Sequence, residues 1–457
     1  MAGIGFELKK ILRQQTFLSE FKAYLYAAMV SAGPWIMSII CLAVLGLYRS
    51  TGVGVRAHEV FRATVIYTYA FTLILTGCLQ LVATRYLADR FYEKKTQNTL
   101  ATFFTCTVAV LVGGTLLAGL GYAFFEISPL HKFCAVILFL IVSMIWLCMV
   151  FLSAIKDYNS IVYAFAVGSA ASVVAALRMG PVMGAEGYLL GYLLGQALIL
   201  FWLLAKMLQE FQPVDAWDPD FLPYFKRFWD LAAIGFIFNL GIWADKLVFW
   251  LAPDGRTIEP WFRTHDLYEG PVFFSYITIV PALALFLLKI ETRFYEHYKR
   301  YYGKIIGKKD MAGILIEKEL MIRMLKESLR EVLIIQGGIT LLCLVFTPAL
   351  VKMAHLSPLQ IPLFRITLIG AFLQVLLAIN IIILFYFDLR HCVLRVALLF
   401  TTTNAGFSWL SIRLGFQFYG YGYTYACLTA LLCAFYFLHT SVRDLEYITF
   451  AKQPVTP

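Results

Sequence analysis

Polar segments divide the chain into about twelve long apolar runs, and this feature limits the available folds more than any other. A helix needs about 20 consecutive apolar residues to cross the hydrocarbon core of a bilayer, so each run predicts one transmembrane helix. With 61% hydrophobic and 14% charged residues, the chain has too little polar surface for a soluble globule of 457 residues. We therefore expect an all-α polytopic membrane protein. Its predicted spans lie at about residues 23–48, 63–85, 99–124, 133–155, 160–177, 187–208, 230–252, 271–290, 331–351, 362–387, 392–412 and 420–441.

Two short motifs occur twice along the chain. The tetrapeptide RFYE occurs at residues 90–93 and again at 293–296, each time shortly after an apolar run. An Arg-x-Gly motif followed by Gly-Tyr occurs at residues 178–188 and, with unchanged spacing, at 413–423. The second copy is longer by about the size of the charged segment 303–331. We interpret the chain as two related halves with an insertion in the second one.

The related halves predict the domain organisation. A polar, proline-broken segment at residues 209–228 separates the first six predicted spans from the last six. We expect an N-terminal six-helix lobe over residues 1–208, a cytoplasmic linker over 209–228 and a C-terminal six-helix lobe over 229–457. Because six is an even number, both lobes enter the membrane from the same side, as in parallel-repeat transporters. This predicts two pseudo-symmetric lobes around a central cavity.

The basic residues predict the orientation of the chain. The net charge is +10, and most lysines and arginines outside the runs lie in alternate loops on the side of the N-terminus. Cytoplasmic loops carry such an excess, so we expect both termini in the cytoplasm. Since these residues flank apolar runs, the positive charge indicates topology, and we expect no nucleic-acid partner.

Two segments outside the spans are basic and amphipathic. Residues 1–18 place leucines and isoleucines near helical spacing among lysines, which indicates an interfacial helix on an anionic leaflet or an ordinary basic flank of the first span. Segment 303–331 intersperses apolar residues with lysines and arginines in a similar way. Such a helix can lie on anionic lipids or dock a cytoplasmic partner, and the sequence leaves both alternatives open.

Ionisable residues inside apolar runs are the first candidates for a functional site, because a buried charge is costly in a bilayer. Asp245 and Lys246 are adjacent in the seventh run, so on a helix they point about 100° apart, and each could pair with a neighbouring helix. Lys246 could also reach the membrane surface. Asn239 and Trp243 share a face of this helix and could continue a polar path or pack against a neighbour. The tenth run adds three candidates for the lining of a translocation path: Arg365, Gln374 and Asn380.

The repeated Arg-x-Gly and Gly-Tyr motifs lie where predicted spans meet the outer face. Arg178 and Arg413 are equivalent, with Glu186 near the first, and the repetition indicates a cavity lining or a structural clamp on the following loop. Tyr188 and Tyr423 belong to tyrosine clusters that open the sixth and twelfth spans. Such tyrosines commonly form an aromatic belt at the headgroups, although sugar rings also stack on them. We treat these five residues as candidates for an outer mouth.

Signatures of enzymes are missing from the sequence. Asp218-Pro219-Asp220 has the spacing of a sugar-nucleotide metal motif, but no strand-rich segment surrounds it. None of the 7 histidines lies in the middle of a run, the Gly-Lys pairs lack the rest of a P-loop, and the 9 cysteines form no metal-binding pattern. We expect no enzymatic activity, no cofactor and no metal site.

The start of the chain carries a family resemblance. MAGIGFELKK at residues 1–10 and SAGPW at residues 31–35 resemble the PelG family of membrane exopolysaccharide exporters, as do the length and the basic loop after the eighth span. That family is similar to the multidrug/oligosaccharidyl-lipid/polysaccharide exporter (MOP) superfamily, which includes lipid-linked oligosaccharide flippases. The resemblance implies a bacterial inner-membrane location and a polysaccharide rich in N-acetylgalactosamine. It also implies assembly with a cytoplasmic glycosyltransferase and other Pel inner-membrane subunits.

The leading functional hypothesis is translocation of a nascent, Pel-like exopolysaccharide across the inner membrane, behind a cytoplasmic glycosyltransferase. The alternative is an ion-coupled exporter of small cations or of lipid-linked oligosaccharides, in which Asp245 would bind the ion. A membrane-embedded transferase ranks below both, because it requires a catalytic motif.

Overall fold

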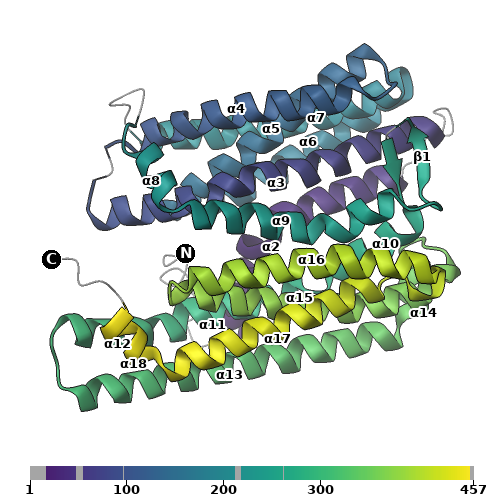
Figure 1. The fold of residues 1–457 in the computed structure, drawn as a ribbon. Coiled ribbons are helices and arrows are strands. Elements are labelled where there is room, and N and C mark those ends of the chain that lie inside the picture. The colour runs from purple at the N-terminus through teal and green to yellow at the C-terminus, as the bar shows by residue number, and fades with distance from the viewer. Residues whose placement is uncertain (1–16, 48–54, 96, 212–217, 261, 453–457) are drawn as a thin grey trace. The chain divides into compact units, whose positions relative to one another are not determined.

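The computed structural model describes residues 17–47, 55–95, 97–211, 218–260 and 262–452, most of them in long helices (Figure 1). The chain divides into two compact units, which we call the N-terminal unit (Gly33–Asp266) and the C-terminal unit (Leu267–Pro457 with Met1–Ala32). Helix α2 (Phe17–Leu47) contributes to both of them. The amphipathic helix expected over residues 1–18 lies almost entirely outside the described residues.

The N-terminal unit is a helical bundle with a small two-stranded sheet. Local signals mark where its helices begin: Ser128 accepts a hydrogen bond from the His131 backbone N–H, and Pro129 occupies the first position of the helix that follows. After α2, the elements of this unit are α3 (Val55–Tyr92), α4 (Thr99–Ala123), α5 (Pro129–Ala154), α6 (Tyr158–Met183), α7 (Ala185–Glu210), α8 (Phe221–Arg227), α9 (Trp229–Trp250), β1 (Arg256–Glu259) and β2 (Phe262–Thr264).

The C-terminal unit is also a helical bundle, and it contains more interruptions. Ser357 and Gln360 form a reciprocal capping box just before one of its long helices. Its elements are α10 (Asp266–Ile277), α11 (Val280–Lys289), the π-helical turn η1 (Ile290–Phe294), α12 (Tyr295–Ile306), α13 (Met311–Val345), α14 (Thr347–Met353), η2 (Pro358–Gln360), α15 (Ile361–Tyr386), α16 (Arg390–Leu414), η3 (Phe416–Phe418), α17 (Tyr421–Arg443), α18 (Leu445–Tyr447) and η4 (Ile448–Lys452).

Helices α6 and α7 pack with their backbones in close approach. A Cβ atom at Gly187 would lie 2.2 Å from the carbonyl oxygen of Met179, and Gly191 and Gly195 approach the backbone of α6 similarly. These glycines, spaced by four residues, therefore form one packing face of α7. The other Gly-Tyr motif has the same role in the C-terminal unit, because a Cβ atom at Gly422 would lie 2.5 Å from the carbonyl oxygen of Phe407 on α16.

The strands β1 and β2 form an antiparallel hairpin, with Arg256 opposite Thr264. Charged side chains fasten this hairpin to the start of α3: Arg256 pairs with Glu59 at 2.7 Å, and Arg56 pairs with Glu259. The all-α class predicted from the sequence did not include these strands. We call this end of the N-terminal unit the hairpin end, and the opposite end, at the last turns of α3, the α8 end.

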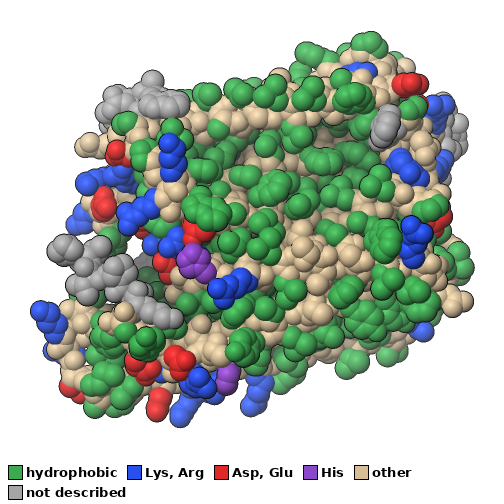
Figure 2. Space-filling model, viewed as in Figure 1, with side chains coloured by type: hydrophobic (Ala, Val, Ile, Leu, Met, Phe, Trp, Pro, Cys, Tyr) green, Lys and Arg blue, Asp and Glu red, His purple; other side chains and the backbone are tan. Residues whose placement is uncertain are grey.

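Each predicted span coincides with a helix or a pair of helices, and ten helices of the described residues are long and apolar enough to cross a bilayer. On the face shown in Figure 2, hydrophobic side chains cover the middle of the helices and charged side chains gather at their ends. Many of the exposed side chains in the spans are large and apolar, including Leu120, Phe201 and Leu341 at 64%, 66% and 65% exposure. Lipid tails solvate such a surface, so the predicted polytopic, helical membrane class is confirmed.

Two local details differ from the expectation. The span predicted at 271–290 is divided into α10 and α11, with Pro281 in the first turn of the second helix. The segment 303–331 is not a separate surface helix, because most of it continues without a break into the next span as α13.

The compact units and the predicted repeat halves are different divisions of the chain. The predicted C-terminal half begins at residue 229, whereas α9 and the β-hairpin belong to the N-terminal compact unit. Compactness follows contacts in space, and the halves follow recurring motifs. The lobes over 1–208 and 229–457, with the linker 209–228, stay a prediction, and residues 212–217 of that linker lie outside the described residues.

Candidate functional site

Helix α9 carries an ion pair between adjacent residues. Asp245 is fully buried and Lys246 is 7% exposed. The Lys246 Nζ atom lies 3.0 Å from Asp245 Oδ1 and donates a hydrogen bond of 2.9 Å to the carbonyl oxygen of Ile242. The flexible lysine side chain folds back over its own helix, so the two predicted site residues pair with each other. A buried carboxylate held in this way is compensated by an ammonium group.

The other two predicted residues of α9 lie beside this pair. The ring of Trp243 lies beneath the Lys246 ammonium, 5.9 Å from Nζ to the ring centroid, within the range of a cation–π contact. The indole N–H of Trp243 is buried without a hydrogen-bond partner among the described residues. The Asn239 side chain donates a hydrogen bond of 3.1 Å to the carbonyl oxygen of Leu73 on α3. Of the two roles considered for Asn239, this contact is the one expected for helix packing.

Two glycines bring α3 and α9 together near Asn239. A Cβ atom at Gly235 would lie 2.0 Å from the carbonyl oxygen of Gly77, and one at Gly77 would lie 2.4 Å from Asn239 Nδ2. No other residue type fits at this crossing without separation of the helices. The crossing therefore fixes α9, and with it the Asp245–Lys246 pair, against α3.

An aromatic contact extends the α9 site toward the hairpin end. The rings of Tyr67 on α3 and Trp250 on α9 stack with centroids 4.2 Å apart and planes 8° apart. The Tyr67 hydroxyl donates a 2.8 Å hydrogen bond to the carbonyl oxygen of Arg263, whose guanidinium in turn donates to Ala252. Trp250 was not among the predicted site residues, although it lies seven residues after Trp243 and so shares its side of the helix.

In the C-terminal unit, α15 and α17 bring together two residues that were predicted for different places. The Tyr423 hydroxyl donates a 2.5 Å hydrogen bond to Gln374 Oε1, and both side chains are buried. Gly370 makes room for this tyrosine, because a Cβ atom there would lie 2.3 Å from the ring. The third candidate, Asn380, is buried and donates to the carbonyl oxygen of Leu376 within its own helix. Arg365 is exposed near the start of α15.

The remaining candidates for an outer mouth do not form one cluster. Arg178 is exposed and has no ion pair among the described residues. Glu186 accepts a 2.6 Å hydrogen bond from the Ser128 hydroxyl, which joins the start of α7 to the start of α5. Tyr188 is buried and stacks on His58 at 5.7 Å. Arg413 is exposed, with its guanidinium 5.0 Å from the ring centroid of Trp409.

The first RFYE motif and the Asp218-Pro219-Asp220 sequence meet at the α8 end. Asp218 is fully buried and accepts hydrogen bonds from the hydroxyls of Tyr86 at 2.7 Å and Thr102 at 2.6 Å. Arg90, the first residue of the motif, pairs with Asp220 at 2.5 Å. These acids lie in the predicted linker, and they fasten the segment before α8 to α3 and α4.

Tyr224 of α8 extends this network. Its hydroxyl donates a 2.5 Å hydrogen bond to Asp89 on α3. Burial, followed by this carboxylate, raises the pKa of the Tyr224 phenol, so the proton that it donates is retained at neutral pH. In the second RFYE copy, Phe294 is buried and Arg293 is exposed in the π-helical turn η1, so the two motifs have different surroundings.

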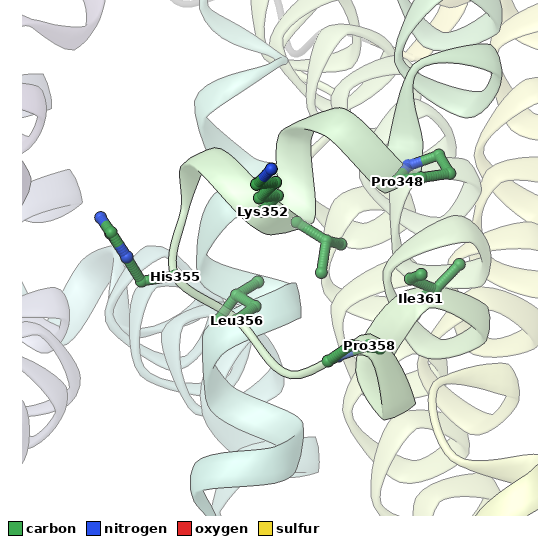
Figure 3. A pocket seen from close by; sticks show the side chains of 7 residues that line it. Pro348, Lys352, His355, Leu356, Pro358 and Ile361 are labelled. Atoms are coloured by element: carbon green, nitrogen blue, oxygen red, sulfur yellow. The ribbon is translucent and has the colours of Figure 1, made fainter.

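A pocket of about 500 Å³ lies around α14, which follows the C-terminal end of α13 (Figure 3). None of the predicted site residues lines it. Its lining residues are Pro348, Val351, Lys352, His355, Leu356, Pro358 and Ile361. Among the residues that the structure describes, no group of three or more His, Cys, Asp or Glu side chains could hold a metal ion.

The fold places the chain among known transporter structures. It superimposes on a MOP superfamily transporter from Pyrococcus furiosus with a TM-score of 0.64 at 13% identity, which covers 93% of this chain and 96% of that one. The outward-facing and inward-facing structures of a MATE family multidrug resistance transporter of the MOP superfamily give TM-scores of 0.63 and 0.60. Their identities are 12% and 11%, and they cover 93% and 92% of this chain and 96% and 95% of those chains. The chain therefore shares the fold of these MOP superfamily transporters.

The family is shown by the sequence as a whole. Residues 1–450 match the family described as "PelG: Putative exopolysaccharide Exporter (EPS-E)". The chain belongs to the PelG family, and the resemblance found at its first residues extends over nearly its full length. No curated protein matches the chain.

Proposed function

We propose that this protein translocates a nascent, Pel-like exopolysaccharide rich in N-acetylgalactosamine across the bacterial inner membrane. It receives the growing chain from a cytoplasmic glycosyltransferase and works with the other Pel inner-membrane subunits. The observation that carries this proposal is the PelG family match over residues 1–450, on a fold shared with MOP transporters. Both termini and the α8 end lie on the cytoplasmic side, in keeping with the excess of basic residues in those loops.

The side chains of the candidate path suit weak contacts with a neutral sugar polymer. The half-buried ring of Trp243 supplies aromatic surface, and Asn239 beside it on the same helix is also only half-buried. Sugar rings bind to aromatic faces and to hydrogen-bonding groups, and contacts that are individually weak let a chain advance. A gate that closes fully is incompatible with a polymer still attached to its synthase, so we expect polymerisation to push the chain along the path.

The ion pair supports this function over ion-coupled export of small cations. A carboxylate that binds a proton or a sodium ion has to be available to that ion. Asp245 is fully buried and its charge is compensated by Lys246 at 3.0 Å. A bound cation would have to displace an ammonium group that is covalently fixed at the next residue.

The test is deletion of the protein in a host that produces the polymer. We expect polymer to accumulate in the cytoplasm while glycosyltransferase activity in the lysate stays unchanged, because synthesis and translocation are separate steps. Expression of the full chain should restore polymer outside the cell. Unchanged export in the deletion strain would contradict the proposal. So would a purified complex that moves only finished, lipid-linked oligosaccharides.

A further inference from the structure

The connection between α12 and α13 exposes a cluster of large apolar side chains beside lysines. Ile306, Met311, Leu315 and Ile316 are 77%, 48%, 39% and 57% exposed. We call these four residues, with the exposed Lys308 and Lys309, the hairpin tip, because α12 and α13 form a helical hairpin; it is distinct from the β-hairpin of the N-terminal unit. A single exposed apolar side chain is common on protein surfaces, but a group of them commonly marks an interaction site.

The hairpin tip belongs to a firmly held part of the C-terminal unit. Asp310 caps α13 by accepting a 2.9 Å hydrogen bond from the Gly313 backbone N–H, and Lys304 donates to the carbonyl oxygen of Gly313 at 3.2 Å. Glu317, in the second turn of α13, pairs with Lys304 at 3.3 Å and lies 3.4 Å from His297 on α12. These contacts lock the two helices together and leave the tip facing outward.

A second set of contacts ties the same turn of α13 to the end of the chain. Lys318 is buried, pairs with Glu446 at 2.5 Å and donates to the carbonyl oxygen of Arg443 at 3.1 Å. The inner face of α13 is completed by the buried side chains of Ile314, Met321 and Leu325. The buried charged groups of this part of α13, Glu317 and Lys318, therefore have partners within their own unit, while the hairpin tip presents apolar surface to its surroundings.

Contact with the bilayer does not account for the tip. Helix α13 has 35 residues, so it is about 52 Å long, against about 30 Å for a hydrocarbon core. Its last charged residues before the apolar part are Arg330 and Glu331. Ile316 precedes them by about fourteen residues, or about 21 Å along the helix, whereas a headgroup layer is only about 7 Å thick. In Figure 1, α12 and the start of α13 project together at one end of the unit.

We propose that the hairpin tip binds a soluble cytoplasmic protein. The partner's binding surface is apolar at its centre and carries carboxylates at its rim. The apolar side chains form the centre of the contact, as is usual in interfaces. Lys308 and Lys309 border them and have no ion pair among the described residues, so an acidic rim on the partner complements the site. The inference rests on the proposed function in that the partner is the glycosyltransferase that supplies the polymer.

The test is site-specific photocrosslinking in cells that express the full chain with an epitope-tagged glycosyltransferase of the same export system. A crosslinking residue at Ile316 should capture the tagged enzyme, and the double charge reversal K308E/K309E should lower the yield about tenfold through loss of the rim contacts. The matched control is the same crosslinker at Leu341, which lies on α13 at 65% exposure but within the apolar part of the helix. It should capture no glycosyltransferase.

Three results overturn the inference: crosslinks at Ile316 to lipid only, crosslinks between two copies of this chain, or no difference between Ile316 and Leu341. Polymer export, measured in the same cells, separates this inference from the proposed function. If export proceeds while the tip captures no enzyme, the docking site is wrong and the exporter function stands. If deletion of the whole chain leaves export unchanged, the proposed function itself is wrong.

Discussion

At the scale of single residues, the Asp245–Lys246 pair has an unusual geometry. Adjacent helical residues point in different directions, so most intrahelical pairs are three or four residues apart. Here the lysine stem is long enough to return to its neighbour, and the ammonium group also bonds the Ile242 carbonyl oxygen. The two charged side chains differ in their exposure. Asp245 has no exposed surface, whereas Lys246 keeps 7% exposure and a backbone acceptor.

This asymmetry gives the first prediction. Lys246→Gln leaves a fully buried carboxylate without its ammonium, and removal of one partner of a buried pair costs about 3–5 kcal/mol. Asp245→Asn should cost less, because the ammonium keeps its backbone acceptor and its contact with Trp243. The double variant Asp245→Asn/Lys246→Gln should be more stable than Lys246→Gln alone. The measurement is the thermal midpoint of the purified variants in detergent.

The same variants test the function of the pair. Asp245→Asn should keep polysaccharide export if the pair is structural, because neither charge is then consumed in the transport cycle. An ion-coupled exporter that uses Asp245 would lose activity in this variant at unchanged protein level. Loss of export by a well-folded Asp245→Asn protein would therefore favour the ion-coupled alternative.

At this scale the sequence predicted which charged residues are candidates for a site, but not which groups they contact. An Asp and a Lys inside an apolar run stand out in the sequence, because a charged residue in the bilayer is energetically unfavourable. The partner depends on rotamers and on neighbouring helices. The contact between Tyr423 and Gln374 was missed for a related reason: the two residues are 49 positions apart, and only the packing of α15 on α17 brings them together.

At the scale of elements, the recurring Gly-Tyr motif marks a recurring helix contact. Gly187 lets α7 approach α6, and Gly422 lets α17 approach α16, each within its own unit. Membrane helices have little hydrophobic drive to associate and depend on this kind of close packing. Equivalent glycines at equivalent contacts are what a duplicated bundle requires.

The second prediction is that Gly187→Ala and Gly422→Ala destabilise the protein by similar amounts. The added methyl groups would lie 2.2 Å and 2.5 Å from backbone oxygen atoms, and overpacking of this kind costs about 1–3 kcal/mol. The matched controls are Gly119→Ala in α4 and Gly406→Ala in α16, where nothing lies within 4 Å of the new methyl group. Both controls should be neutral or stabilising, since alanine favours helix. Thermal unfolding in detergent compares the four, and equal effects of all four would refute the close-packing role.

Sequence patterns predicted the helices better than their interruptions. A long apolar run has few alternatives to a membrane helix, and every predicted span coincides with helix. The break between α10 and α11, the π-helical turn η1 and the β-hairpin are set by local packing, and no run length encodes them. The fate of segment 303–331 was left open because amphipathic helices on lipids and in protein contacts share one pattern.

At the scale of the whole molecule, the repeat and the compact units describe different properties. The recurring motifs indicate two related halves, and the polar segment at residues 209–228 separates these halves in the sequence. The contacts place boundaries at residues 32–33 and 266–267 instead, so that one helix, α2, contributes to both units. A duplicated transporter can show both patterns when helices at its boundaries pack outside their own repeat. The orientation of the molecule in the membrane depends on neither division.

Helix α13 allows the orientation to be tested directly, which is the third prediction. This uninterrupted helix of 35 residues separates Lys308, just before it, from Met353, which is 74% exposed in α14 just after it. With the natural cysteines replaced, a membrane-impermeant maleimide should label Met353→Cys in intact cells, and Lys308→Cys only after permeabilisation. The physical reason is the cluster of lysines and arginines around α12 and the start of α13, which holds that end in the cytoplasm. Reversed labelling would invert the topology and place the hairpin tip on the periplasmic side, away from any cytoplasmic glycosyltransferase. Equal labelling of both sites in intact cells would show that α13 does not cross the membrane, and the twelve-span prediction would then fail at this helix.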